Sequence, residues 1–199
     1  MCKKILLGAL LGGLTVFIWQ FISHVPLPWF HTSLNQFENP EAVEEVLAAN
    51  AKQDGMYFLP NPGMDAPKEE MDQAMKQMTE GFSVFGSINQ KGRLGYGKAL
   101  AFQFLYNVLG AALITFILCQ FKEGGYGCRI GVAVFFALFA IFTAILTNWS
   151  WWGFSNTYTG FLIFDHLVGW TLAGLVLAKI TLPKPEPDEE DSPAEAKAD

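Results

Sequence analysis

The stretch that decides the fold is residues 158–180, which read YTGFLIFDHLVGWTLAGLVLAKI. It is long enough to cross the hydrocarbon core of a bilayer as a helix, which takes roughly 20 apolar residues. Its interior nevertheless carries Asp165 and His166 side by side. Ionisable groups inside a membrane are costly and usually have a structural or functional reason. The stretch therefore predicts a membrane helix with an unusual polar pair.

Three more apolar runs of similar length lie at residues 5–23, 99–119 and 130–147. None shows the period-2 alternation of barrel strands, so all are expected to be helical. The whole chain has 199 residues, of which 51% are hydrophobic and 16% charged, whereas a soluble domain carries about 25% charge. This excludes an ordinary soluble protein. It predicts an all-α integral membrane protein with a four-helix transmembrane bundle.

Four parts follow from these runs. They are transmembrane span 1 at residues 1–24, an insertion at 25–98, transmembrane spans 2–4 at 99–183, and an acidic tail at 184–199. The tail cannot bury enough apolar surface to order itself.

The insertion is expected to be small and helical. Asn39-Pro40 predicts a helix start, with Asn as the N-cap and Pro at the first position. A second helix is expected from near Pro67 to Glu80. Residues 56–59 read as a short extended stretch. Two placements stay open for residues 82–88, along the membrane surface or folded back on the helices.

Orientation is read from Lys and Arg near the ends of the spans, which gather in the cytoplasm. These residues are Lys3, Lys4, Lys122, Arg129, Lys179 and Lys184. The uncharged loop at 148–157 and the insertion fall on the other side. Both termini are therefore expected in the cytoplasm and the insertion outside it. The three cysteines then lie on the side where thiols stay reduced.

The intramembrane polar candidates are Asp165, His166, Gln103, Asn107 and His24. On one interpretation they form a proton relay or ligate a metal or haem, with His24, His31 and His166 converging on copper or zinc. On the other, Asp165 bonds to Gln103 or Asn107 of the second span and holds two helices together. We expect the Asp165 side chain to face the bundle in either case.

Met71, Met75 and Met78 form a stripe on the second expected helix of the insertion. Such a stripe is typical of an adaptable packing face, against the same chain or a partner. The spacing of Met75 and Met78 is also one that copper carriers use, since thioethers bind Cu(I). Both interpretations stay open.

Tryptophans crowd the loop between the third and fourth spans, at Trp149, Trp151 and Trp152. Aromatic residues at this level anchor a protein at the membrane–water interface. The cluster also suits a flat surface for lipid, quinone or a partner protein.

Both ends of the chain resemble a group of small uncharacterised bacterial four-span inner-membrane proteins. The resemblance lies in the opening KILLG at 4–8, the Ser23-His24 pair, the segment LPW at 27–29, and the closing WGF at 152–154 and DHLVGW at 165–170. It implies a multi-pass protein of the bacterial inner membrane. It implies no activity, so no site residue is carried over from it.

The sequence therefore predicts a non-enzymatic accessory or scaffold subunit of a bacterial membrane assembly. It contains no nucleophile–base pair, no cofactor-binding loop and no convincing metal cluster, so no cofactor is expected. The expected partners are membrane lipid and other membrane subunits or further copies of the chain, not nucleic acid. The alternative is a small transporter, or a metal- or haem-binding electron-transfer component, using Asp165, His166 and His24.

Overall fold

The computed structural model describes residues 2–121 and 123–183. Among these residues, four helical stretches are long and apolar enough to cross a membrane. They are α1 (Cys2–His24), α5 (Tyr96–Gln120), a third stretch that runs from α6 (Tyr126–Ala140) through the π-helical turn η1 (Ile141–Ile145) into α7 (Leu146–Trp152), and α8 (Asn156–Thr181). The four predicted apolar helices are thus confirmed.

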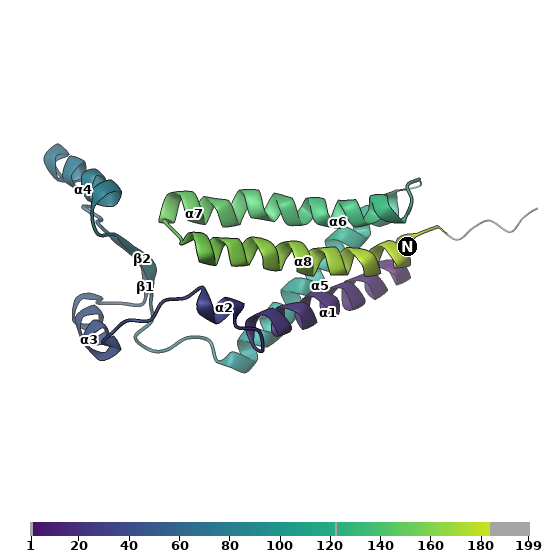
Figure 1. Ribbon diagram of the computed structural model, residues 1–199, viewed down its shortest axis with the longest axis horizontal. Helices are drawn as coiled ribbons and strands as arrows, with labels where there is room; N and C mark the ends of the chain where they lie inside the picture. Colours follow the sequence, from purple (N-terminus) through teal and green to yellow (C-terminus); the bar gives the residue numbers. More distant parts are fainter. Residues whose placement is uncertain (1, 122, 184–199) are drawn as a thin grey trace, which may run out of the picture.

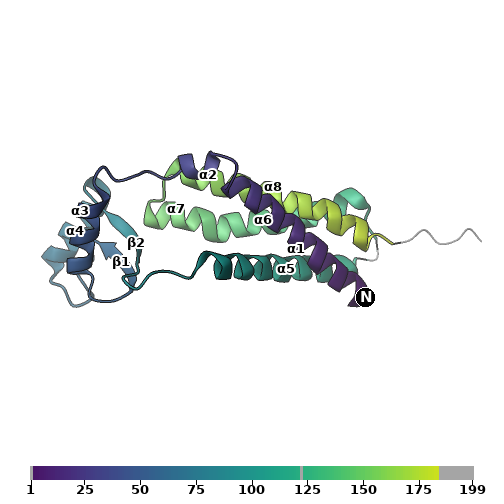
Figure 2. The same ribbon diagram turned by 90° about the horizontal axis from the view of Figure 1, so that it is seen from below.

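The four stretches form an elongated bundle with α1 and α8 at its centre (Figures 1 and 2). Helix α1 packs against both α5 and α8, and α8 also packs against α6. The start of α1 and the end of α8 lie together at one end of the bundle, which we call the terminal end (Figure 1). The insertion lies beyond the opposite end, which we call the insertion end.

Glycines on α1 allow the close approach of its neighbours. A Cβ at Gly8 would meet Thr115, and a Cβ at Gly12 would lie 2.8 Å from Leu177. A Cβ at Gly13 would lie 2.7 Å from the backbone of Val108. Small residues are the usual means by which membrane helices pack backbone to backbone. Helix α1 therefore presents small residues to two helices at once.

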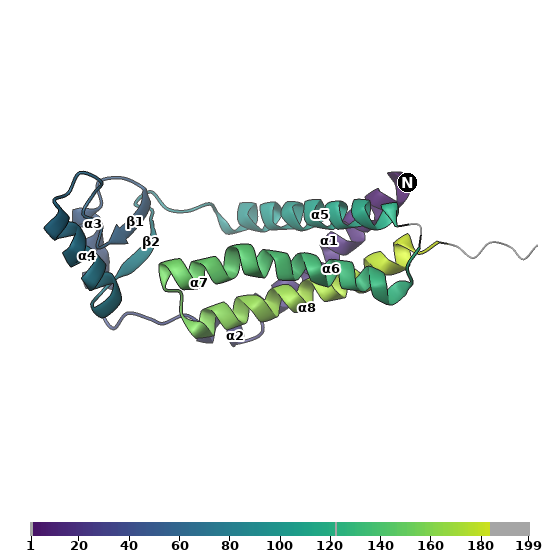
Figure 3. The same ribbon diagram turned by 90° about the horizontal axis from the view of Figure 1, so that it is seen from above.

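The insertion contains helices and a two-stranded sheet (Figure 3). Its elements are α2 (Trp29–Thr32), α3 (Pro40–Asn50), β1 (Gly55–Leu59), α4 (Lys68–Glu80) and β2 (Val84–Ile88). The strands are antiparallel, with Gly55 opposite Ile88 and Leu59 opposite Val84. Asn39 caps α3, as predicted, by accepting a hydrogen bond of 3.0 Å from the Ala42 amide.

The insertion was expected to be helical, with a short extended stretch at residues 56–59, and it also contains this sheet. The extended stretch at residues 56–59 and the open stretch at 82–88 are the two strands of this sheet. Each strand has only five residues, and α4 lies between them. A hairpin is recognised in a sequence by a long alternation of apolar and polar residues and by a two-residue turn between the strands. These two strands have neither signal.

The third stretch is longer than the expected 130–147. It extends through the tryptophan cluster to Trp152 and ends at Gly153, whose φ of +67° lies in the left-handed region. Gly commonly ends a helix this way because it has no Cβ to clash. Ser155 then caps α8 by accepting from the Tyr158 amide. The acidic tail at 184–199 lies outside the described residues.

Trp152 joins the insertion to the bundle. Its ring stacks on Phe85 of β2, with centroids 4.1 Å apart and an angle of 11° between the planes. Phe58 of β1 meets the same indole edge-on at 5.8 Å. Trp152, which was expected to act as a membrane anchor, thus also contacts both strands of the sheet. Trp149 also has a specific role, because its Nε1 donates to Asn156 at 2.7 Å.

Candidate functional sites

Asp165 lies in α8 and is only 3% exposed. Its Oδ1 accepts a hydrogen bond of 2.5 Å from the hydroxyl of Ser23, which is fully buried in α1. Its backbone oxygen accepts a bond of 3.1 Å from Nε1 of Trp19. Gly169, one turn further along α8, gives Trp19 room, since a Cβ there would lie 3.0 Å from the indole. The carboxylate therefore faces the bundle and joins α8 to α1.

The expected partners of Asp165 were wrong. Gln103 and Asn107 of α5 bond instead to Gln20 of α1. The Gln20 Oε1 accepts bonds of 3.1 Å from Gln103 and 2.7 Å from Asn107, and Gln103 also donates to Asn107 at 3.1 Å. Gln20 and Ser23 lie almost one turn apart on α1, so this helix bonds to α5 through one residue and to α8 through the other. The sequence places Gln20 inside the first span but contains no signal for its partner.

His24, the last residue of α1, lies next to both groups. Its Nδ1 is 2.9 Å from the Ser23 hydroxyl and 3.0 Å from the main-chain oxygen of Gln20. Its ring lies 4.8 Å from the ring of Phe30 and 5.1 Å from that of Phe161, centroid to centroid. A continuous chain of hydrogen bonds thus runs from Asp165 through Ser23 to His24. Because Ser23 is fully buried, its hydroxyl has no access to a substrate.

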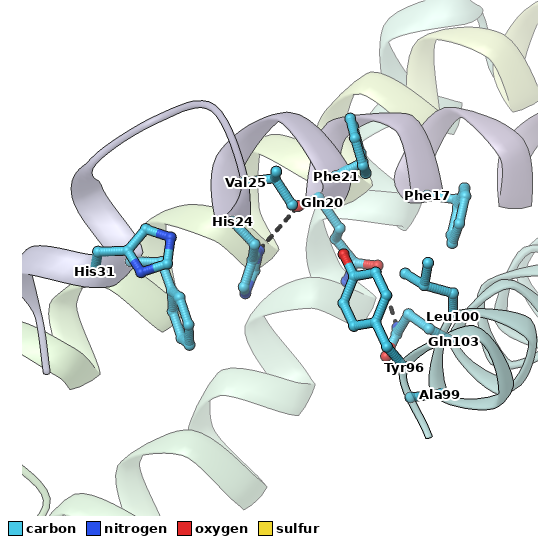
Figure 4. Close-up of a pocket in the computed structure, with 11 residues that line it drawn as sticks. Phe17, Gln20, Phe21, His24, Val25, His31, Tyr96, Ala99, Leu100 and Gln103 are labelled. Atoms are coloured by element: carbon cyan, nitrogen blue, oxygen red, sulfur yellow. Dashed lines mark hydrogen bonds between the residues drawn. The ribbon is translucent and has the colours of Figure 1, made fainter. Parts of the chain in front are cut away.

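A pocket of about 540 Å³ lies beside His24, between α1, α2 and the start of α5 (Figure 4). Gln20, His24, His31, Tyr96 and Gln103 supply its polar atoms. Aromatic and aliphatic side chains supply the rest of the wall; these include Phe17, Phe21, Phe30 and Leu100. Pockets of this size that combine apolar walls with a few polar groups are typical of small-molecule sites.

The three histidines do not converge. His24 and His31 both line the pocket, whereas His166 is half-buried in α8 and is not among the lining residues. The Nδ1 of His166 is buried without a hydrogen-bond partner in the described part of the chain. Within residues 2–121 and 123–183, no group of three His, Cys, Asp or Glu side chains has the geometry to hold a metal ion.

Arg129, which was expected near the end of a span, is a buried polar residue. It lies in the first turn of α6 and is fully buried. Its guanidinium donates to three main-chain oxygens, those of Leu118 at 2.8 Å, Phe121 at 3.1 Å and Gly124 at 3.2 Å. These are carbonyls at and just after the end of α5, where the helix dipole favours a cation. Arg129 thus holds the α5–α6 turn together.

The methionine stripe of α4 is exposed. Met71 is 45%, Met75 64% and Met78 40% exposed, and the buried side of the helix has only Ala74. The stripe therefore does not pack against the described part of the same chain. A face for a partner and a copper site both remain hypotheses.

Comparison with known protein families, with curated proteins and with solved structures finds no match.

Proposed function

We propose that the protein is a non-enzymatic accessory or scaffold subunit of a bacterial membrane assembly, and that its insertion binds a partner subunit. One observation carries this proposal. Between residues 34 and 95, the buried residues are Ala51, Pro60 and Ala74, all of them small. A domain of about 60 residues normally buries, on folding, about 60% of the surface that its unfolded chain exposes. This segment lacks such a core, so contact with another surface would stabilise it.

Large apolar side chains of the insertion are exposed instead. The most exposed are Phe37, Val46, Met56, Met64, Met75 and Phe82, each with at least 61% of its surface accessible. Exposed apolar surface of this extent is typical of a protein–protein or membrane contact. It supports a partner that covers apolar surface of the insertion, including Met75 of α4.

The net charge of the insertion indicates what kind of partner surface it would bind. Residues 34–95 contain 10 Asp or Glu and 5 Lys or Arg, so the net formal charge of this segment is −5. Like charges repel across an interface and opposite charges attract. This favours a partner with basic residues around an apolar patch over a second copy of the same face.

The proposed setting is the bacterial inner membrane, with both termini cytoplasmic and the insertion outside the cytoplasm. Lys3 and Lys4 lie in the first turn of α1, Arg129 in the first turn of α6 and Lys179 in the last turn of α8, whereas the turn between α7 and α8 has no charge. This distribution follows the tendency of Lys and Arg to stay in the cytoplasm.

Site-directed photo-crosslinking at native expression tests the proposal. A photoreactive benzoylphenylalanine replaces Met75, which is on the exposed stripe, or Lys76, which points about 100° away on the same helix. The expected result is one discrete adduct from position 75, and little from position 76. A negative charge placed one turn before the probe by Met71→Asp should abolish the adduct. Met71→Leu, which keeps this position apolar, should preserve it.

Mass spectrometry of the adduct then identifies the partner. A single membrane subunit supports the proposal, and an adduct of two copies of the chain shows a homo-oligomer instead. Lipid alone at position 75, or an adduct that Met71→Asp leaves unchanged, would contradict it.

A small-molecule role that uses Asp165, His166 and His24 is the second candidate. It is favoured by the hydrogen-bond chain that leads from Asp165 to His24 at the pocket. Metal and haem analysis of the purified protein checks its electron-transfer form. A stoichiometric metal or haem that is lost in His24→Gln would favour this candidate over the accessory role.

A further inference from the structure

We propose that the pocket between α1, α2 and α5 binds a neutral amphipathic molecule of the membrane, with a hydroxyl head group and an apolar tail. This proposal does not depend on the docking role of the insertion. It follows from the hydrogen-bonding atoms that remain free at the pocket.

The amide cluster leaves one donor and one acceptor free. Gln20 uses its Oε1 twice, so its Nε2 has no partner in the described part of the chain. Gln103 uses both hydrogens of its Nε2, and its Oε1 has none. If all three amides were turned over, the three bonds would persist and the two glutamines would exchange roles. The pocket therefore has one amide NH2 group and one amide oxygen available in either arrangement.

His24 adds a second acceptor. The Gln20 main-chain oxygen lies 3.0 Å from Nδ1 of His24 and accepts only, so Nδ1 carries the hydrogen. The Ser23 hydroxyl donates its own hydrogen to Asp165, which leaves its oxygen to accept as well. In the neutral imidazole, Nε2 is then an acceptor. Figure 4 shows that this side of the ring points away from α1 toward the pocket.

Charge excludes most other head groups. The eleven residues that line the pocket include no Asp, Glu, Lys or Arg. An ionised phosphate, carboxylate or ammonium would enter a mostly apolar site without an opposite charge, which is costly. A quinone carbonyl accepts a hydrogen bond but cannot donate one. It would therefore leave the free amide oxygen and the Nε2 atom of His24 without a donor. A hydroxyl both donates and accepts, and it matches both kinds of free atom.

The remaining walls suit an apolar tail that enters sideways from the bilayer. Phe17, Phe21 and Leu100 lie along the pocket toward the middle of the bundle (Figure 4). Phe21 is 49% and Val25 46% exposed at its rim, where they would face lipid. A molecule in the membrane could therefore reach the polar atoms without crossing water.

Photolabelling of the purified full-length protein in nanodiscs tests the proposal. The probe is a C16 fatty alcohol with a diazirine in its tail, and unlabelled C16 alcohol, its methyl ether, palmitate and a short-chain ubiquinone serve as competitors. The label should map to peptides of α1 and α5 that line the pocket. The alcohol should compete best. The methyl ether cannot donate and should compete roughly 10-fold less well, about the effect of one hydrogen bond.

Two variants and a control complete the experiment. Gln103→Leu removes the amide, and Ala99→Trp fills part of the pocket one helical turn before Gln103 while leaving the residues of the polar cluster unsubstituted. Both variants should lose most of the specific labelling. The control Thr143→Val, which lies in the third span and outside the pocket, should keep it. Ala99→Trp keeps the test valid if Gln103→Leu fails to fold. Equal competition by the methyl ether, stronger competition by palmitate or ubiquinone, or labelling that Ala99→Trp leaves unchanged would overturn the proposal.

Discussion

The hydroxyl of Ser23 in α1 and the carboxylate of Asp165 in α8 are 2.5 Å apart, although 142 residues separate them in the chain. Both groups are buried, at 0% and 3% exposure. The bond therefore joins the first and last membrane helices of the bundle. Leaving a buried acceptor without its donor costs the full desolvation free energy of that acceptor, which is more than the net contribution of the hydrogen bond.

Ser23→Ala should accordingly lower the free energy of unfolding by about 1–3 kcal/mol, because Asp165 keeps its burial and loses its donor. Asp165→Asn keeps the shape and an acceptor oxygen, so it should cost less than Asp165→Leu, which removes both. Thermal unfolding in detergent measures all three. Equal losses in Asp165→Asn and Asp165→Leu would show that the charge, and not the hydrogen bond, is what the fold needs.

Arg129 should be intolerant of substitution. It satisfies three carbonyls around the end of α5, and hydrogen bonds to a charged group contribute about 1.5–3 kcal/mol each at most. Arg129→Met should therefore lower stability by about 3 kcal/mol or more. Arg129→Lys keeps the charge but reaches fewer carbonyls, so its stability should lie in between. Chemical unfolding measures this order, and equal stability of Arg129→Met and the wild type would refute the capping role.

Two helix glycines provide a matched test of close packing. A Cβ at Gly13 would lie 2.7 Å from the backbone of Val108, while a Cβ at Gly131 of α6 has nothing within 4 Å. Gly13→Ala should destabilise the bundle by about 1–3 kcal/mol through overpacking. Gly131→Ala should be neutral or slightly stabilising, because Ala favours the helix. Their melting temperatures should therefore move in different directions.

Trp152→Ala should loosen the attachment of the sheet, because it removes the rings on which Phe85 and Phe58 rest. Amide hydrogen exchange should rise in β1 and β2 and stay the same in α5 and α8. Trp151 is 77% exposed and makes no ring contact in the described part of the chain, so Trp151→Ala is the control. If both variants raise exchange equally, the stacking does not hold the sheet.

Reporter fusions should give a cytoplasmic signal at Gly125 and an external signal at Met64 and Gly153. The reason is the distribution of Lys and Arg at the terminal end. An alkaline phosphatase fusion active at Met64 and a fluorescent protein fusion bright at Gly125 would agree with this. A cytoplasmic signal at Met64 would reverse the proposed orientation.

The helices were predictable because hydrophobic length alone identifies a membrane span. The capped start of α3 was also predictable, because Asn39 and Pro40 form a local signal. The sheet was not, since its two short strands pair across α4 and nothing local links them. The same reason explains the candidate site. The burial of Asp165 followed from its position, but its partner Ser23 depends on how α1 and α8 cross. The close contacts at Gly12 and Gly169 belong to that crossing.

The hydrogen bonds of α1 also bear on how the protein is made. Ribosomes deliver α1 first, and at that moment Gln20 and Ser23 have no partners from other helices. Gln103 and Asn107 follow 83 and 87 residues after Gln20, and Asp165 comes 142 residues after Ser23. Gln20 therefore gains its partners once α5 has emerged, whereas the Ser23 hydroxyl gains its partner in α8 only when the final span emerges. A chain that stops before Asp165 leaves the Ser23 hydroxyl with only its contacts inside α1, to the Gln20 oxygen and to His24.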